Sequence, residues 1–266
     1  MCPRETYGCM TTIVASEDAM IRTETLASVL GEETEVVSAE LESADDIVDA
    51  AGEAAGLVVD VNTPVPTVVF EECEQLQIVA RAGVGVDQID FEAAAANDVT
   101  VVNVPDYCRD EVSTHAASLL FAGIRRLSVF DRAVKGGNWH WTDGQPIYRL
   151  TGETVGFLSF GQLAQATAEK LQGFDCRFVA ADPYVDEETM AEYGVEKVPF
   201  DDLLEEADHV SIHAPLTDDT RGMFDRDAFR QMSDTAVLVN VGRGPIVKED
   251  ALAWALEEGE IAAAGL

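Results

Sequence analysis

Residues 154–184, TVGFLSFGQLAQATAEKLQGFDCRFVAADPY, decide the fold of the chain around them. Apolar runs and turn residues divide this stretch into a buried strand at 154–158, a turn at 159–164, a helix at 165–173 and a strand at 176–181. Asp182 follows the second strand. Strand, helix and strand in this order form a βαβ unit, so the sequence predicts a parallel sheet covered by helices.

The turn is a changed form of the G-x-G-x-x-G motif that binds dinucleotides. In that motif the first glycine makes the bend, the second lets the backbone approach a pyrophosphate, and the third lets helix and strand pack closely. Ser159, Gly161 and Ala164 hold these three places. Gly161 is kept where a side chain would collide with phosphate, and alanine is an accepted third residue. Ser159 is therefore the departure from the motif.

Two further features of this stretch fit a dinucleotide. The start of the helix offers free N–H groups and the positive end of its dipole to phosphate. Asp182 follows the turn by about 20 residues, the spacing of a carboxylate that binds the adenosine ribose. An acid at this place favours NAD over NADP. On the motif alone, an ordinary buried βαβ unit without a nucleotide remains an open alternative.

Acidic residues strongly outnumber basic ones: 50 Asp and Glu against 17 Lys and Arg give a formal net charge of -33. Such charge destabilises a compact state by self-repulsion unless salt screens it. In about 1 M salt, the screening length is about 3 Å. Hydrophobic residues make up 47% of the chain, which argues against disorder. The composition indicates a halophilic cytoplasmic protein whose acids form a solvated surface. It disfavours nucleic acid and anionic membranes as partners.

Cysteine spacing and hydropathy narrow the class of protein further. The five cysteines are odd in number and lack C-x-x-C spacing, so the sequence predicts neither a disulfide framework nor a metal site. No apolar run approaches the ~20 residues of a membrane span. Residues 1–9 have no hydrophobic signal core and are expected to form a flexible extension. The cysteines are Cys2, Cys9, Cys73, Cys108 and Cys176.

Outside the opening stretch, strands and helices alternate along the chain. A long apolar helix is predicted at 110–127, and it separates two groups of strands. The sequence therefore predicts an α/β fold of two domains with parallel sheets, 10–106 and 107–266. The further strands are expected at 12–15, 35–38, 56–60, 76–80 and 100–103 in the first domain, and at 195–198, 209–212, 236–240 and 261–266 in the second.

Four segments together carry a family resemblance. They are RAGVGVD at 81–87, the nucleotide turn ending in ADPY at 181–184, HAPLT at 213–217 with Thr220, and VNVGRG at 239–244. In this order they resemble the D-isomer specific 2-hydroxyacid dehydrogenases, a family that includes D-3-phosphoglycerate dehydrogenase. NVPDYC at 103–108, with Trp139 and Trp141, is similar to the branch that also contains C-terminal-binding-protein-like dehydrogenases.

The resemblance implies a flavodoxin-like substrate domain at 10–106, a Rossmann NAD-binding domain at 107–266, and an active site in the cleft between them. It implies that the backbone amides near Val84 and Gly85 hold the substrate carboxylate. Arg243 would be catalytic, binding that carboxylate and the oxygen being reduced. Arginine suits this role because it stays charged and forms a bidentate fork. The alternatives are an exposed loop arginine and ordinary turn glycines.

Seven residues are expected to bind the cofactor by the same resemblance. Backbone groups of the helix start would contact the pyrophosphate and Asp182 the ribose, while the other three line the cofactor; packing at strand ends is the alternative for those three. Many relatives have arginine where this chain has Gln162, so phosphate affinity is expected to be lower. The seven are Gly161, Gln162, Leu163, Asp182, Ala214, Thr220 and Val241.

The proton donor is not evident in the sequence. His115, His140 and His209 fit exposed or structural positions, and His213 matches a cofactor wall. The family's histidine, oriented by a glutamate, normally follows the segment resembling 263–266, where this chain ends. We therefore expect a C-terminally truncated, homodimeric, NAD-dependent oxidoreductase of 2-oxo or 2-hydroxy acids with little activity. A non-catalytic NAD(H)-binding or corepressor-like protein and an inactive truncated paralogue remain alternatives.

Overall fold

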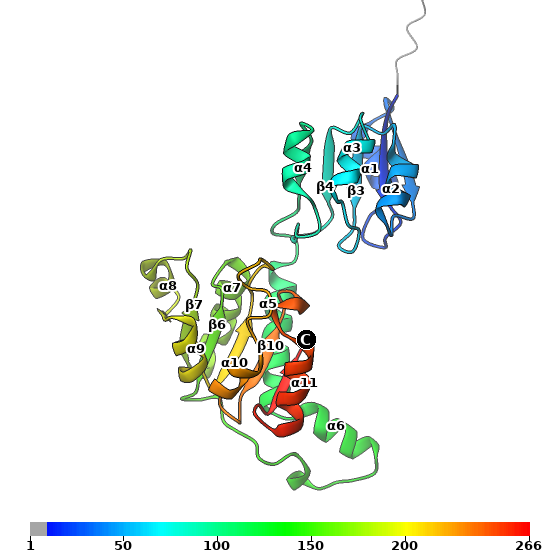
Figure 1. The fold of residues 1–266 in the computed structure, drawn as a ribbon. Helices are drawn as coiled ribbons and strands as arrows, with labels where there is room; N and C mark the ends of the chain where they lie inside the picture. The colour runs from blue at the N-terminus through cyan, green and yellow to red at the C-terminus, as the bar shows by residue number, and fades with distance from the viewer. Residues whose placement is uncertain (1–9) are drawn as a thin grey trace, which may run out of the picture. The chain divides into compact units, whose positions relative to one another are not determined.

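The computed structural model describes residues 10–266. Residues 1–9, with the expected extension, Cys2 and Cys9, lie outside the described residues. The chain divides into two compact units, Met1–Tyr107 and Cys108–Leu266 (Figure 1). The sequence places its domain boundary after residue 106, one residue before the break between these units.

The first unit is built on a five-stranded parallel sheet in the order β2-β1-β3-β4-β5. This is the flavodoxin-like order 2-1-3-4-5, so the expected fold of this unit is confirmed. Its strands are β1 (Thr11–Ser16), β2 (Thr34–Ala39), β3 (Gly56–Val59), β4 (Ile78–Arg81) and β5 (Thr100–Val102). Its helices are α1 (Thr23–Leu30), α2 (Ala44–Ala51), α3 (Thr67–Glu72) and α4 (Phe91–Ala96).

Side-chain caps fix where the helices of this unit begin. Ser43 and Asp46 form a capping box at the start of α2, each side chain bonding the other's backbone N–H. Asp90 caps α4 by accepting from the Ala93 N–H, and it also accepts from the Thr67 hydroxyl at the start of α3. These caps satisfy N–H groups that a helix leaves unpaired at its start.

The second unit contains a six-stranded parallel sheet in the order β11-β10-β9-β6-β7-β8. This is the Rossmann order, with the chain crossing from one half of the sheet to the other between β8 and β9, so the expected Rossmann fold is confirmed. The crevice for a ligand in such a sheet lies at the carboxyl ends of β6 and β9. The strands are β6 (Thr154–Leu158), β7 (Arg177–Ala181), β8 (Val195–Lys197), β9 (His209–Ile212), β10 (Val237–Asn240) and β11 (Ala263–Gly265).

Helices cover both faces of this sheet. Alternate strand residues enter different cores: Val155 and Phe157 pack with α5 and α7, whereas Leu158 packs with α9, α10 and α11. The helices are α5 (Arg109–Ile124), α6 (Leu127–Lys135), α7 (Gln162–Leu171), α8 (Glu187–Glu192), α9 (Phe200–Glu206), α10 (Arg226–Gln231) and α11 (Glu249–Glu258). Short 3₁₀ turns are η1 (Trp141–Gly144), η2 (Gln172–Phe174) and η3 (Gly244–Ile246).

Two helix boundaries differ from the sequence prediction. The helix expected at 165–173 begins at Gln162, because Gly161 is already its extended N-cap residue. The helix expected at 110–127 ends at Ile124, since Arg126 takes the left-handed conformation with φ 53°. A separate helix, α6, follows, and the sequence prediction missed it. In Figure 1, α6 and the loop after it extend away from the sheet of the second unit.

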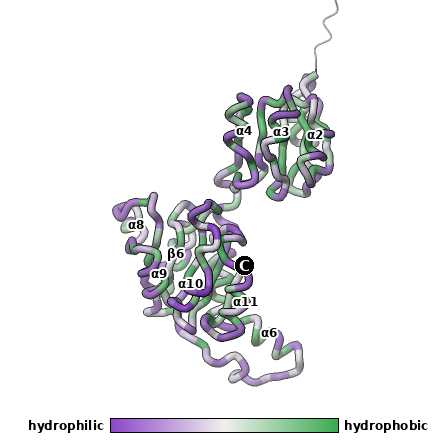
Figure 2. Tube along the Cα trace, viewed as in Figure 1, coloured by the Kyte–Doolittle hydropathy of each residue, from purple (hydrophilic) through white to green (hydrophobic). Residues whose placement is uncertain are grey.

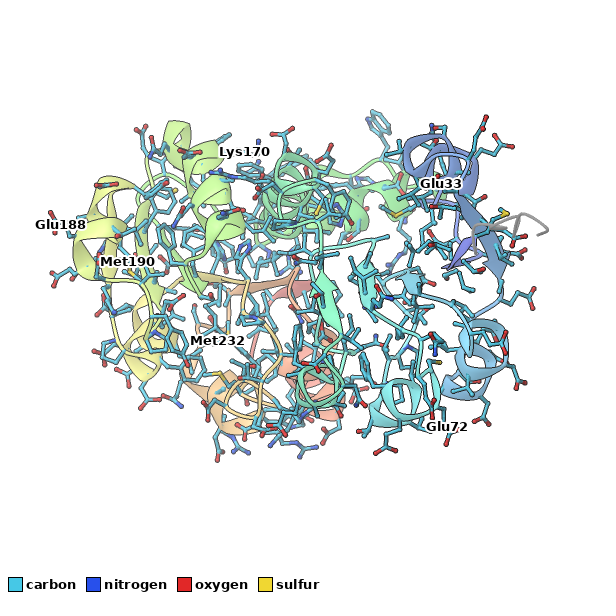
Figure 3. The ribbon with its side chains drawn as sticks, turned by 90° about the horizontal axis from the view of Figure 1, so that it is seen from above. Glu33, Glu72, Lys170, Glu188, Met190 and Met232 are labelled. Atoms are coloured by element: carbon cyan, nitrogen blue, oxygen red, sulfur yellow. The ribbon has the colours of Figure 1, made fainter. Side chains whose placement is uncertain are left out.

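Most of the described acidic residues are accessible to solvent. Among the described Asp, Glu, Lys and Arg residues, Asp182 and Arg81 are the ones in the buried class. In Figure 3 the labelled Glu188 side chain points away from α8, while Met190 of the same helix is fully buried. Figure 2 shows the tube of α8 as largely hydrophilic. The structure thus places most of the negative charge in contact with solvent.

Candidate functional site

The turn after β6 leaves open space in front of α7. Gly161 is exposed, and a Cβ built on it would meet no atom within 4 Å. Among the described residues, no acceptor is bonded to the first-turn N–H groups of Gln162 and Leu163. An unobstructed helix start with free N–H groups suits a phosphate, so the residues present fit the pyrophosphate of a dinucleotide. Ala164 is fully buried and lets α7 pack closely on the sheet.

Asp182 joins this turn to the end of β7. Its Oδ2 accepts hydrogen bonds from the Ser159 hydroxyl at 2.9 Å and the Phe160 N–H at 2.8 Å. Its Oδ1 accepts from the N–H groups of Tyr184 at 2.8 Å and Val185 at 3.2 Å. A carboxylate has about four acceptor sites. The chain itself therefore occupies the acceptor capacity that a ribose hydroxyl would use.

Hydrogen bonding keeps Asp182 ionised. Its burial acts to raise its pKa, but the bonds from the Phe160 and Tyr184 N–H groups, the Ser159 hydroxyl and the Val185 N–H outweigh burial and hold the pKa below its ordinary value. The Ser159 hydroxyl is the donor most easily displaced, because it can rotate while backbone N–H groups cannot. Sequence reasoning missed this pair, although a hydroxyl residue in place of the motif's first glycine was its signal.

The segment after β9 contains two expected cofactor residues. Ala214 is buried, at 3% exposure. The Thr220 hydroxyl donates to the Pro215 carbonyl at 2.7 Å, and its oxygen accepts from the Thr217 N–H at 2.8 Å. Thr220 therefore closes the loop 215–220, and a contact between its side chain and a cofactor stays a prediction.

Arg243 follows β10 on a turn held by Asn240. The Asn240 Oδ1 accepts from the Gly242 N–H, and its Nδ2 donates to the Arg243 carbonyl, both at 3.0 Å. A Cβ on Gly242 would lie 2.7 Å from the Ala214 carbonyl oxygen, so only glycine fits. The Arg243 Nη1 donates to the Gly242 carbonyl at 3.1 Å. This turn fixes the backbone that carries the guanidinium at the carboxyl end of β10.

A cavity of about 570 Å³ lies beside this turn. It brings Val241, an expected cofactor residue, together with His115, which sequence reasoning set aside as a helix-surface histidine. Glu111 and His115 are four residues apart and so share one face of α5, a spacing that could have drawn attention to them. The lining residues are Glu111, Val112, His115, Asn240, Val241, Gly242 and Leu266.

Two other histidines are poor proton donors at neutral pH. Burial lowers the pKa of His213 to about 3. Its Nε2 lies 2.9 Å from the Ser211 hydroxyl, and its buried Nδ1 has no partner. His209 lies at the opposite, amino end of β9, where its Nδ1 accepts from the Val237 N–H and its Nε2 bonds Glu153 at 2.7 Å. His209 is therefore structural, and both rings are neutral.

The loop 83–86, which contains the expected substrate-binding residues Val84 and Gly85, follows β4 in the first unit. A Cβ on Gly83 would lie 2.7 Å from a methyl carbon of Val61, so a larger residue there would have to displace the Val61 side chain. The Val84 carbonyl accepts from the Asn103 side chain at 2.8 Å, and the Gly85 carbonyl accepts from Arg81 at 3.0 Å. The loop is thus fixed through its carbonyl oxygens.

The described residues contain neither a metal-binding cluster nor a membrane-spanning helix. Within residues 10–266, no group of three or more His, Cys, Asp or Glu side chains is arranged to hold a metal ion. Every helix in this part of the chain is too short or too polar to cross a bilayer.

The family follows from comparison with known proteins. Residues 117–266 match the model of the D-isomer specific 2-hydroxyacid dehydrogenase NAD-binding domain. The chain belongs to this family. The resemblance carried by the four motifs is confirmed, and the second unit contains the NAD-binding domain of a D-2-hydroxyacid dehydrogenase.

Individual relatives agree with this assignment. A D-3-phosphoglycerate dehydrogenase of Mycobacterium bovis is 36% identical over 90% of this chain and 45% of its own length. A glyoxylate reductase of Korarchaeum cryptofilum is 38% identical over 83% of this chain and 67% of its own. The structure of a D-lactate dehydrogenase from Aquifex aeolicus with NAD and lactic acid has a TM-score of 0.86 at 22% identity, covering 96% of this chain and 76% of that one, which shows the fold. The chain thus spans about half the length of the phosphoglycerate dehydrogenase.

Proposed function

We propose that the protein is an NAD-dependent oxidoreductase that transfers hydride between nicotinamide and the C2 carbon of a 2-oxo or 2-hydroxy acid. The observation that carries the proposal is the open space at Gly161 in front of unbonded amides, on the same sheet edge as Arg243. When bound, the cofactor would donate the hydride as NADH to a 2-oxo acid, or accept it as NAD⁺ from a 2-hydroxy acid. The residues of the chain bind the cofactor and the substrate, orient them and polarise the substrate oxygen.

The proposed roles follow the chemistry of each group. The Gln162 and Leu163 amides bind the pyrophosphate, and Asp182 binds the adenosine ribose. Ala214, Thr220 and Val241 line the cofactor.

On the substrate, the amides of Val84 and Gly85 bind the carboxylate. Arg243 binds the same carboxylate and stabilises the negative charge that develops on the oxygen during reduction.

A turnover assay tests this proposal. NADH oxidation would be followed with a panel of 2-oxo acids that includes glyoxylate and hydroxypyruvate, at several KCl concentrations. Saturable turnover with at least one acid supports the proposal. NADH binding without turnover across the panel would favour the alternative of a non-catalytic NAD(H)-binding protein.

We also propose a homodimer formed through the second unit. Helix α6 has no buried residue, and Trp139 and Trp141 after it are 83% and 74% exposed. Large apolar side chains gathered on one projecting segment favour burial against another protein surface. We propose that a second copy of the chain covers this segment, and light scattering should give the dimer mass for the native chain and a lower mass for a Trp139→Ser, Trp141→Ser variant.

The proposed location of the protein is the cytoplasm.

A further inference from the structure

The loop after β4 is held by three successive carbonyl groups. The Gly83 carbonyl accepts from the Val104 N–H at 3.1 Å. The Val84 carbonyl accepts from the Asn103 Nδ2 at 2.8 Å, and the Gly85 carbonyl accepts from the Arg81 Nε at 3.0 Å. The donors come from the end of β4 and from the segment after β5. The hydrogen bond to each carbonyl oxygen therefore fixes the orientation of its peptide group.

Peptide geometry then sets the direction of three N–H groups. In a trans peptide the N–H points away from the C=O of the same group. These peptides are trans, so the amides of Val84, Gly85 and Val86 each point away from the donor that holds the neighbouring oxygen. Among the described residues these three amides have no hydrogen-bond acceptor, and the three residues are half-buried. Successive free amides of this kind can bind an anion.

Arg81 connects this loop to the end of β3. Its side chain is buried, and the residue is 2% exposed. Besides Gly85, its guanidinium donates to the carbonyl oxygens of Val61 at 2.6 Å, Thr63 at 3.0 Å and Asp60. A planar fork with donors in several fixed directions can hold four carbonyls at once, which a lysine ammonium cannot. Arg81 therefore sets the position of Gly85 relative to the sheet.

Asn103 holds the middle peptide from an exposed position. Its side chain belongs to the NVPDYC segment and donates to the Val84 carbonyl. Because Asn103 is exposed, replacing it removes this bond without opening the hydrophobic core. It therefore offers a way to loosen the loop while the fold is kept.

We propose that Arg81 and Asn103 are positioning residues that hold the amides of Val84, Gly85 and Val86 ready for a substrate carboxylate. This inference rests on the proposed function, because the anion is the carboxylate of the 2-oxo acid. It adds the Val86 amide to the donors and gives Arg81 and Asn103 a role in substrate affinity. Neither side chain contacts the substrate.

The test follows the three amides directly. Oxamate, a non-reducible analogue of a 2-oxo acid, is titrated into the ¹⁵N-labelled full chain with NADH present and KCl fixed. The Val84, Gly85 and Val86 amide resonances should shift saturably. Since one neutral hydrogen bond is lost, Asn103→Ala should weaken oxamate binding about fivefold. Arg81→Lys should weaken it more than tenfold, and NADH affinity should be unchanged in both variants.

A matched control separates positioning from general stability. Asn97→Ala removes a bond of the same kind, from the Asn97 Nδ2 to the Ala93 carbonyl at 2.9 Å, at the end of α4. It should leave oxamate affinity as in the native chain. In turnover assays Asn103→Ala should raise KM for the 2-oxo acid with little change in kcat.

The outcomes distinguish this inference from the proposed function. Native oxamate affinity in Asn103→Ala would overturn the positioning role, even if Arg81→Lys failed to fold. Amides that do not respond in an active enzyme would overturn the anion site and leave the dehydrogenase activity standing. Responding amides in a chain without turnover would support the anion site and count against the proposed activity.

Discussion

At the scale of single residues, Asp182 accepts four hydrogen bonds from its own chain. A ribose hydroxyl must therefore replace one of the four donors, and the Ser159 hydroxyl is the one free to rotate. Ser159 also has φ 67°, a left-handed conformation that costs a residue with a side chain about 1 kcal/mol or more. The residue at the first position of the motif thus affects both stability and cofactor affinity.

Replacing Ser159 separates these two effects. Ser159→Gly and Ser159→Ala both remove the competing hydroxyl, so both should bind NADH several-fold more tightly. Each loses a hydrogen bond of about 1 kcal/mol. Only glycine also relieves the left-handed strain, so Ser159→Gly should have about the native free energy of unfolding. Ser159→Ala should be about 1 kcal/mol less stable than the native chain in denaturant unfolding. Weaker NADH binding in both variants would show that the hydroxyl belongs to the cofactor site.

Arg243 is predicted to act in the reaction through its bidentate fork. Arg243→Lys keeps the charge but loses the fork, so kcat/KM for the 2-oxo acid should fall by well over tenfold while NADH affinity changes little. The exposed Arg221 of the same unit is a matched control, and Arg221→Lys should retain native kinetics. Near-normal turnover by Arg243→Lys would make that residue structural.

At the scale of helices and strands, His209 links β9 to two neighbours. Burial lowers its pKa from the ordinary 6.5 despite the nearby Glu153. Since the unfolded chain then binds the proton more readily, the free energy of unfolding should fall as pH drops through about 6.5. Urea unfolding between pH 8 and 5 should show this fall in the native chain and in His140→Gln, an exposed control. A His209→Gln variant with the same pH dependence as the native chain would contradict it.

Elements were predictable where one local signal dominates. Each expected strand from 154–158 onward is present, because buried parallel strands are short apolar runs between turn residues. The break at Arg126 was not predictable, since arginine carries no preference for the left-handed conformation that separates α5 from α6. The start of α7 was placed too late because the turn was counted as six residues.

Site residues were likewise predictable only where a local sequence signal identifies them. Gly161 could be identified from the motif, because the need for space near phosphate is local. The bonds of Asp182 to Ser159 and of Arg81 to the loop after β3 depend on segments that meet only in the fold. Likewise, α5 brings His115 to the cavity beside Val241, which its own sequence neighbours do not reveal.

At the scale of the whole molecule, negative charge is the dominant feature. The net charge is -33, and Asp182 is the buried acid among the described residues, so most of this charge repels across the surface. Screening should therefore stabilise the native state, and the midpoint of thermal unfolding should rise with KCl toward molar concentrations. A flat or falling midpoint across the series would reject a salt-dependent fold.

Cofactor choice depends on both the open turn at Gly161 and the carboxylate of Asp182. An ionised Asp182 should accept a ribose 2′-hydroxyl and repel a 2′-phosphate. Calorimetric titration of the native chain at fixed KCl should give NADH binding at least tenfold tighter than NADPH binding, a difference of about 1.4 kcal/mol. Equal affinities, a preference for NADPH, or no binding of either would contradict NAD binding at this turn.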